Sequence, residues 1–154
     1  MKKLLLICLL VFSSSVAFCQ GKGTQIDTVK MAVNRFFETM RMADTVEMRY
    51  TLTDDMIIQS LHPRKGRNDS LAVMKSDDFL KIIGAPHKEV YDERVTFGDI
   101  NINGNLATVW APYKFYLGKK FSHCGIDVFQ LMRTNLGWKI VSIYYDIRTG
   151  NCPD

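Results

Sequence analysis

Two hydrophobic periodicities divide the chain. Early in the sequence, apolar side chains recur every three or four residues, which is the spacing of an amphipathic helix: Ile26, Val29, Val33, Phe36, Phe37 and Met40. From Tyr91 onward, apolar and polar positions alternate with period two, which is typical of strands. The pattern therefore predicts helices first and a sheet last, and so an α+β domain.

The first half also predicts two shorter helices and one strand. One helix covers Thr45 to Leu52, with Asp44 or Thr45 as its N-cap. The other begins at Ser76, where acidic residues follow a capping residue, and it ends at Gly84. Met56 to Ser60 is expected to form a strand between them.

Four strands are predicted in the second half, separated by short turns. Asn103-Gly104 is a strong hairpin signal, and Gly118-Lys119 and Asn135-Leu136-Gly137 mark two further turns. The strands between them form an antiparallel meander: Val95–Ile102, Asn105–Leu117, Lys120–Arg133 and Trp138–Ile147.

The first nineteen residues have the pattern of an export signal. Lys2 and Lys3 precede the apolar stretch 4–12, and small residues follow it. We therefore expect residues 1–19 to be a signal peptide, 20–25 a flexible leader and 26–154 a single domain of an exported protein, periplasmic or secreted.

Cysteine at the end of this signal leaves two alternatives open. Cleavage after Cys19 would make Gln20 the first residue of the mature chain. A lipoprotein signal would instead have Cys19 acylated, but the bulky Phe18 argues against this because the processing site requires a small residue there.

Removal of the signal changes the composition. The formal net charge falls from +4 to +2, and no block of basic residues is present, so we expect no nucleic-acid partner. No later segment is long and apolar enough for a membrane span. No metal-ligand spacing or cofactor-binding motif is recognisable, so neither metal nor cofactor is expected.

Two cysteines remain in the mature chain, Cys124 and Cys152. In an oxidising compartment they predict one disulfide. The alternative is a buried free thiol and an unrelated cysteine in the tail.

Several segments together resemble the nuclear transport factor 2-like superfamily. They are the Phe36-Phe37 pair with the Met40–Asp44 helix exit and the strand ending at Ser60, then Asn103–Trp110, Ser122–Arg133 and Gly137–Ile140. The resemblance covers nearly all of Ile26 to Arg148. Within the superfamily it is greatest to the exported bacterial members labelled SnoaL-like or putative lumazine-binding.

This resemblance implies a cone-shaped, cystatin-like fold with three N-terminal helices packed on a curved antiparallel sheet. A cavity lies between the sheet and the helices in such proteins. Members include isomerases, dehydratases, cyclases, epoxide hydrolases and binding proteins, so the resemblance implies a fold and a cavity and leaves the reaction open.

Strand register predicts which residues share a face of the sheet. Two-residue turns would place Leu117 opposite Lys120 and Lys114 opposite His123, and Asp127 opposite both Trp110 and Tyr144. One face then carries Trp110, Lys114, His123, Asp127, Phe129, Leu131, Trp138, Ile140, Ser142 and Tyr144. The other carries Tyr113, Phe115, Cys124, Ile126, Val128, Val141, Ile143 and Tyr145. Helices can cover only one of these apolar faces, so the other is expected to form a homodimer.

The first face supplies the candidate site. Its predicted ligand-binding residues are Trp110, His123, Asp127, Tyr144, Phe37 and Met40. Asp127, His123, Asp44 and Tyr144 are the catalytic candidates, because a carboxyl group in apolar surroundings can act as a general acid or base. His123 and Asp127 are four residues apart on one strand, about 13 Å, which is too far for a direct dyad.

Three functions follow from this site. The first is the binding of a small apolar or aromatic ligand in the cone. The second is an isomerase-, dehydratase- or hydrolase-type enzyme with a pocket aspartate as general base. The third is a dimeric interaction module whose cone is filled by core side chains.

Overall fold

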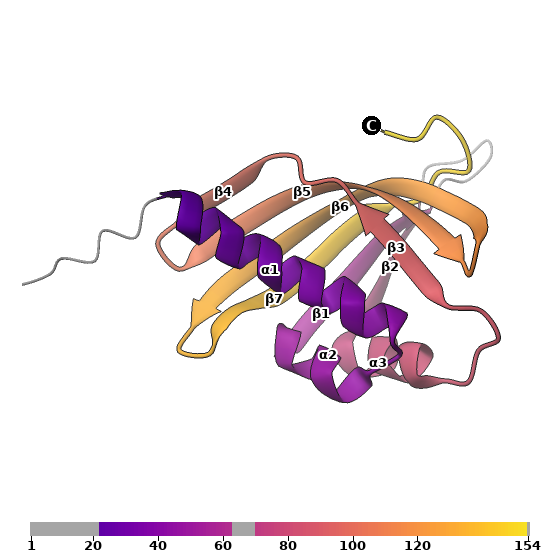
Figure 1. Cartoon of the computed structure of the whole chain (residues 1–154), viewed down its shortest axis with the longest axis horizontal. Helices are drawn as coiled ribbons and strands as arrows, with labels where there is room; N and C mark the ends of the chain where they lie inside the picture. Colours follow the sequence, from indigo (N-terminus) through magenta and orange to yellow (C-terminus); the bar gives the residue numbers. More distant parts are fainter. Residues whose placement is uncertain (1–21, 63–69, 154) are drawn as a thin grey trace, which may run out of the picture.

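In the computed structural model, which describes residues 22–62 and 70–153, three helices pack against one face of a curved, seven-stranded sheet (Figure 1). The predicted signal peptide and Cys19 lie outside the described residues. The helices are α1 (Lys22–Arg41), α2 (Thr45–Thr51) and α3 (Ser76–Gly84). The strands are β1 (Leu52–His62), β2 (Ser70–Lys75), β3 (Tyr91–Val95), β4 (Ile100–Asn103), β5 (Leu106–Leu117), β6 (Lys120–Thr134) and β7 (Gly137–Asp146). The predicted α+β class is confirmed.

The sheet has the order β2-β1-β7-β6-β5-β3, with β4 also paired to β5. All pairs are antiparallel except β1 and β7, which run parallel. The predicted single strand Val95–Ile102 is in fact two strands, because the chain bends between β3 and β4. Gly98 and Asp99 in this bend exchange backbone hydrogen bonds with Trp110. Strand β2 was not predicted.

Helix α1 covers the middle of the sheet with the apolar stripe that its sequence predicts. Val29, Val33, Phe36, Phe37 and Met40 are all buried. The helix begins at Lys22, four residues before the predicted start, so the expected flexible leader is helical from that residue on. The stripe defines the floor of the space between helix and sheet.

A disulfide joins Cys124 on β6 to Cys152 in the C-terminal segment, with a sequence separation of 28 residues. The backbones of Cys124 and Arg148 also exchange two hydrogen bonds. The predicted disulfide is therefore present, and it fixes the C-terminal segment beside the end of the sheet.

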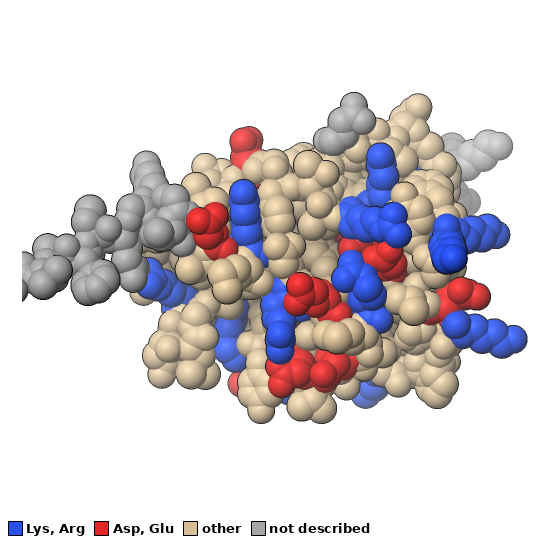
Figure 2. All heavy atoms as spheres, in the orientation of Figure 1, with Lys and Arg blue, Asp and Glu red and all other residues tan. Residues whose placement is uncertain are grey.

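Charges of both signs are mixed over the face that carries α1 (Figure 2). Ion pairs connect the elements there, among them Arg35–Glu47 at 2.6 Å and Arg41–Asp92 at 2.8 Å. No described helix combines the length and the apolar character that a membrane crossing requires.

Candidate functional site

Two irregularities in the sheet determine which side chains reach the helices. Leu117 pairs with Lys120 as predicted, but Ser122 is an extra residue in β6, so Phe115 rather than Lys114 lies opposite His123. Val141 is a second extra residue, in β7, so Tyr145 rather than Tyr144 lies opposite Asp127. Each bulge shifts the pairing by one position and therefore reverses the face that the partner strand presents.

The predicted inner face is accordingly wrong for β5 and for the end of β7. Trp110 lies opposite Val128 and not Asp127, and its side chain is 50% exposed on the outer face. Tyr144 is also on that face and is 40% exposed. Lys114 follows them outward, while Tyr113 and Phe115 point inward.

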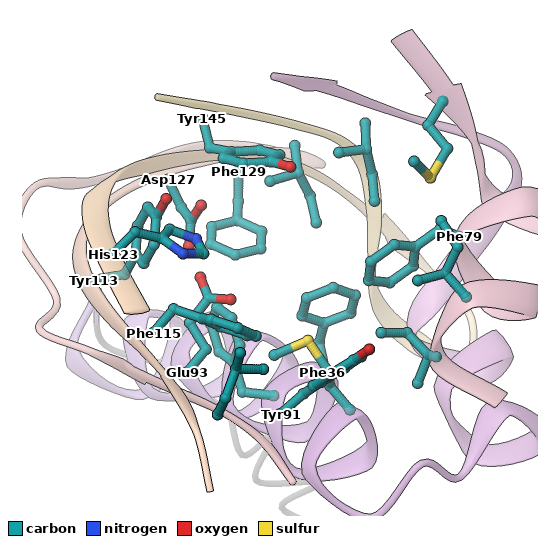
Figure 3. Close-up of a pocket in the computed structure, with 18 residues that line it drawn as sticks. Phe36, Phe79, Tyr91, Glu93, Tyr113, Phe115, His123, Asp127, Phe129 and Tyr145 are labelled. Carbon is teal, nitrogen blue, oxygen red and sulfur yellow. The ribbon is translucent and has the colours of Figure 1, made fainter. Parts of the chain in front are cut away.

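A cavity of about 310 Å³ lies between the inner face and the helices (Figure 3). Helices α1 and α3 and all the strands except β4 contribute to its walls. The lining side chains are Phe36, Phe37, Met40, Ile58, Met74, Phe79, Ile82, Ile83, Tyr91, Glu93, Tyr113, Phe115, Leu117, His123, Asp127, Phe129, Ile143 and Tyr145. Of the predicted ligand-binding residues, His123, Asp127, Phe37 and Met40 line this cavity, and Trp110 and Tyr144 do not.

Two carboxyl groups meet inside this otherwise apolar space. Glu93 extends from β3 and Asp127 from β6, and the two side chains hydrogen-bond to one another. Figure 3 shows the Glu93 carboxyl directed across the cavity toward Asp127 and His123. Because two carboxylates cannot hydrogen-bond without a proton, at least one of the pair carries one.

Burial governs the ionisation of this pair. It raises the pKa of Glu93 to about 7, although the hydrogen bond with Asp127 acts in the opposite direction. Burial also raises the pKa of Asp127 well above its usual range, and the nearby charge of Glu93 adds to the effect. The site therefore holds a proton donor and a proton acceptor side by side near neutral pH.

Aromatic side chains surround the pair. His123 stacks on Phe115 with ring centroids 4.9 Å apart, and the ring of Tyr113 meets it edge-on at 5.8 Å. Burial lowers the pKa of His123, which keeps its imidazole neutral. Its Nδ1 lies 3.0 Å from the hydroxyl of Ser122, the bulge residue.

Asp146, the last residue of β7, holds the side chain of Tyr113 and the backbone of Ile126 by hydrogen bonds. The hydroxyl of Tyr113 donates to the backbone carbonyl of Asp146 at 2.8 Å, and the N–H of Ile126 donates to Oδ1 of Asp146 at 2.7 Å. Gly125 allows this approach, since a Cβ there would overlap the Asp146 carbonyl and lie 2.8 Å from the ring of Tyr113.

Asp44, the remaining catalytic candidate, caps α2. One of its carboxylate oxygens accepts the backbone N–H of Glu47 at 3.0 Å, so Asp44 and not Thr45 is the N-cap of the two predicted candidates. It is not among the residues that line the cavity. This contact gives Asp44 a role in helix stability.

Glu93 was missed from the sequence because its strand was expected to begin at Val95. The signal was nevertheless available in Tyr91-Asp92-Glu93-Arg94-Val95. Period-two alternation places Glu93 on the same face as the apolar Tyr91 and Val95. An acid between two apolar residues on one face indicates an inward carboxyl group.

A family model described as "Putative lumazine-binding" matches residues 24–146 of the chain. No match was found among curated proteins.

Solved structures with the same fold have low sequence identity to the chain. A nuclear transport factor 2-like protein of unknown function from Shewanella baltica is 16% identical, with a TM-score of 0.66, and covers 84% of this chain and 98% of its own. A conserved protein from Planctomyces limnophilus is 16% identical, with a TM-score of 0.67, over 82% and 98% of the two chains. A protein described as a putative dehydratase, from Streptomyces avermitilis, is 16% identical, with a TM-score of 0.61, over 83% and 99%.

Proposed function

Because the chain belongs to the putative lumazine-binding family of nuclear transport factor 2-like proteins, we propose that it binds a small aromatic or apolar ligand inside the cavity between helices and sheet. The Glu93–Asp127 pair would orient the ligand through hydrogen bonds. The surrounding rings would contribute most of the contact area, as in most small-molecule sites.

The observation that carries this proposal is the placement of two hydrogen-bonded carboxyl groups in an apolar cavity. Burying ionisable groups costs free energy, and strongly perturbed pKa values in a cavity are typical of functional sites. The cavity volume of about 310 Å³ is also at the lower end of the range, about 300–1,000 Å³, for small-molecule sites. Open volume of this size argues against the alternative of a cone filled by core side chains.

Calorimetric titration with lumazine, indole and benzyl alcohol tests the proposal. We expect at least one of these probes to bind saturably with a stoichiometry of one. Its affinity at pH 8 should fall about tenfold or more in Glu93→Gln, which corresponds to the loss of one charge-assisted hydrogen bond. Asp55→Asn removes an exposed carboxylate on β1 and is the matched control. Absence of binding by all three probes would contradict the proposal.

A second candidate function is acid–base catalysis by the same pair. It is favoured by one observation, namely that Glu93 and Asp127 share a hydrogen bond with the pKa of Glu93 near 7. In this case Glu93 would remove a proton from a bound substrate and Asp127 would return one. Release of a chemically altered product from a bound substrate would distinguish this function from binding alone.

We further propose that the protein is exported and that Cys124–Cys152 forms there. The disulfide supports an oxidising location, because such bonds persist mainly outside the cytosol. Mass spectrometry of the protein from culture fractions would test cleavage after Cys19 against acylation of Cys19.

The outer face of the sheet is proposed to form a homodimer. Leu106, Trp110, Met132 and Tyr144 all lie on this face and are 40% exposed or more, which supports a protein contact. Sedimentation of wild type and Trp110→Glu would test it. A wild-type protein that sediments as a monomer at high concentration contradicts the homodimer.

A further inference from the structure

The charge of the cavity wall is unbalanced. Glu93 and Asp127 are its acidic groups, whereas none of the described lining residues is a lysine or an arginine. Two arginines on cavity-lining elements, Arg41 on α1 and Arg94 on β3, are paired with another carboxylate. Arg41 and Arg94 both bind Asp92, which alternation places on the opposite face of β3 from Glu93. Ionisation of the pair therefore leaves a negative charge in the cavity that no lysine or arginine among the described lining residues balances.

Asp127 also has an oxygen without a protein donor. Its side chain is only 3% exposed, and among the described residues no N–H or hydroxyl group donates to its Oδ2. The acid Glu93 hydrogen-bonds to this side chain. Buried polar atoms are nearly always paired, so this oxygen shares a proton with Glu93 or, where the proton is lost, can accept a hydrogen bond from a ligand.

The other titratable groups around the pair do not supply a positive charge. Tyr113 from β5 and Tyr145 from β7 are neutral donors, and burial raises the pKa of both. His123 from β6 is neutral because burial lowers its pKa. Asp146 from β7 already accepts hydrogen bonds from Ile126 and Arg148. The segments of α1, α3 and β1 that line the cavity contribute only apolar side chains.

Aromatic rings complete the surroundings that a cation prefers. Phe36, Phe79, Tyr91, Phe115 and Phe129 stand around the space into which Glu93 extends (Figure 3). The faces of such rings attract cations, by about 0.5–2 kcal/mol for each good contact. Acidic groups at one end and ring faces along the walls are the arrangement that an apolar ammonium ion requires.

We infer that the cavity selects a small organic cation, an ammonium group or protonated amine on an aromatic or apolar body. Its N–H groups donate to the Glu93–Asp127 pair, and its body lies against the rings. This inference rests on the proposed function and specifies the ligand class. A hydrated metal ion fits less well, because hard cations take six or more oxygen ligands. No cluster of three or more metal-ligating side chains occurs in the described part of the chain.

Three probes of nearly equal shape test the inference: benzylamine, benzyl alcohol and benzoate. Calorimetry at pH 8 measures the affinity of each for the wild-type protein. We expect benzylamine to bind at least tenfold more tightly than benzyl alcohol, and benzoate to bind most weakly. Glu93→Gln should remove the preference for benzylamine, because Glu93 is the ionised member of the pair at pH 8, while Asp55→Asn should keep it.

The pH dependence of wild type gives a test that needs no variant. The affinity for benzylamine should fall as the pH is lowered from 8 to 6, because the pair gains protons and loses its charge. Near pH 7, binding of benzylamine should release protons, seen as a heat that depends on the ionisation enthalpy of the buffer. Benzyl alcohol should show neither effect.

The outcomes separate this inference from the proposed function. Benzyl alcohol or benzoate binding as tightly as benzylamine would overturn the cation preference and leave ligand binding intact. Affinity for benzylamine that rises toward pH 6 would also overturn it. If none of the three probes binds and lumazine and indole fail as well, both proposals are wrong.

Discussion

Glu93 and Asp127 hydrogen-bond through their carboxyl groups although strand β5 lies between the strands that carry them. Glu93 is opposite Phe115 on β5, and Asp127 is opposite Ala111, four residues further along the same strand. In a flat sheet these positions would be about 13 Å apart along the strand direction alone. The contact therefore requires the curvature of the sheet, and with it the cavity in front of that curve.

Stability should depend on pH through this pair. Below about pH 3 the carboxyl groups are protonated in both the folded and the unfolded chain. As the pH rises toward 7, they ionise first in the unfolded chain, because burial raises the pKa of Glu93 to about 7 in the folded one. The unfolded state then binds fewer protons, so the free energy of unfolding falls over this range.

Asp127→Asn should reduce the fall in the free energy of unfolding that wild type shows as the pH rises. Above pH 7 the variant is expected to be more stable than wild type by more than about 1 kcal/mol, and the difference should be smallest at pH 4. Urea unfolding at pH 4, 6 and 8 measures this. Stability of wild type that rises between pH 5 and 8 relative to the variant would show that the pair is not buried as described.

Gly125→Ala should destabilise the protein and disturb the cavity. The new Cβ would overlap the carbonyl oxygen of Asp146, which is backbone and cannot move aside as a side chain does. We expect a loss of about 1–3 kcal/mol, the usual cost of overpacking. Gly150→Ala is the control, because a Cβ at that glycine would meet no atom within 4 Å. Equal melting temperatures for the two variants would contradict the prediction.

Loss of the disulfide should lower stability without removing the fold. In the chain-entropy model, a bridge over a separation of 28 residues is worth about 3.5 kcal/mol. Cys152→Ser should therefore unfold at a lower urea concentration than wild type. Dithiothreitol should lower the stability of wild type and leave that of the variant unchanged. If dithiothreitol lowered the stability of wild type and of Cys152→Ser equally, its effect would not come from reduction of the Cys124–Cys152 disulfide.

Trp110→Phe should not change the affinity for a ligand in the cavity. Trp110 is on the outer face, whereas Trp138 is buried and its indole N–H donates to Thr28 at 3.2 Å. In protein diluted until it sediments as a monomer, acrylamide should quench the exposed Trp110 and spare Trp138, and a ligand should not protect Trp110 from quenching. A tenfold loss of affinity in Trp110→Phe would mean that the side chain of Trp110 lines the cavity, as the predicted register had it.

The sequence predicts the architecture well because periodicity and turn residues are local signals. The buried stripe of α1, the cap at Asp44, the turn at Gly118 and the Cys124–Cys152 disulfide were all predicted and are present.

The site was predicted less completely, for a physical reason. Both faces of the sheet are apolar, so alternation alone could not reveal the extra residues Ser122 and Val141. Each bulge reversed a face, which exchanged Trp110 for Tyr113 and Tyr144 for Tyr145. The Glu93–Asp127 contact depends on sheet curvature, which no local pattern encodes.

Methionine methyl groups give the most direct test of whether a ligand binds in the cavity between the helices and the sheet. Met40 and Met74 line it, whereas Met31 and Met132 are 68% and 43% exposed on other surfaces. NMR spectra of protein with ¹³C-labelled methionine methyls would be recorded during titration with benzylamine, benzyl alcohol and lumazine. Ligand binding between helices and sheet predicts saturable shifts of Met40 and Met74, with Met31 and Met132 unchanged. Shifts at Met31 or Met132 alone, or no shift with any of the three probes, would contradict it.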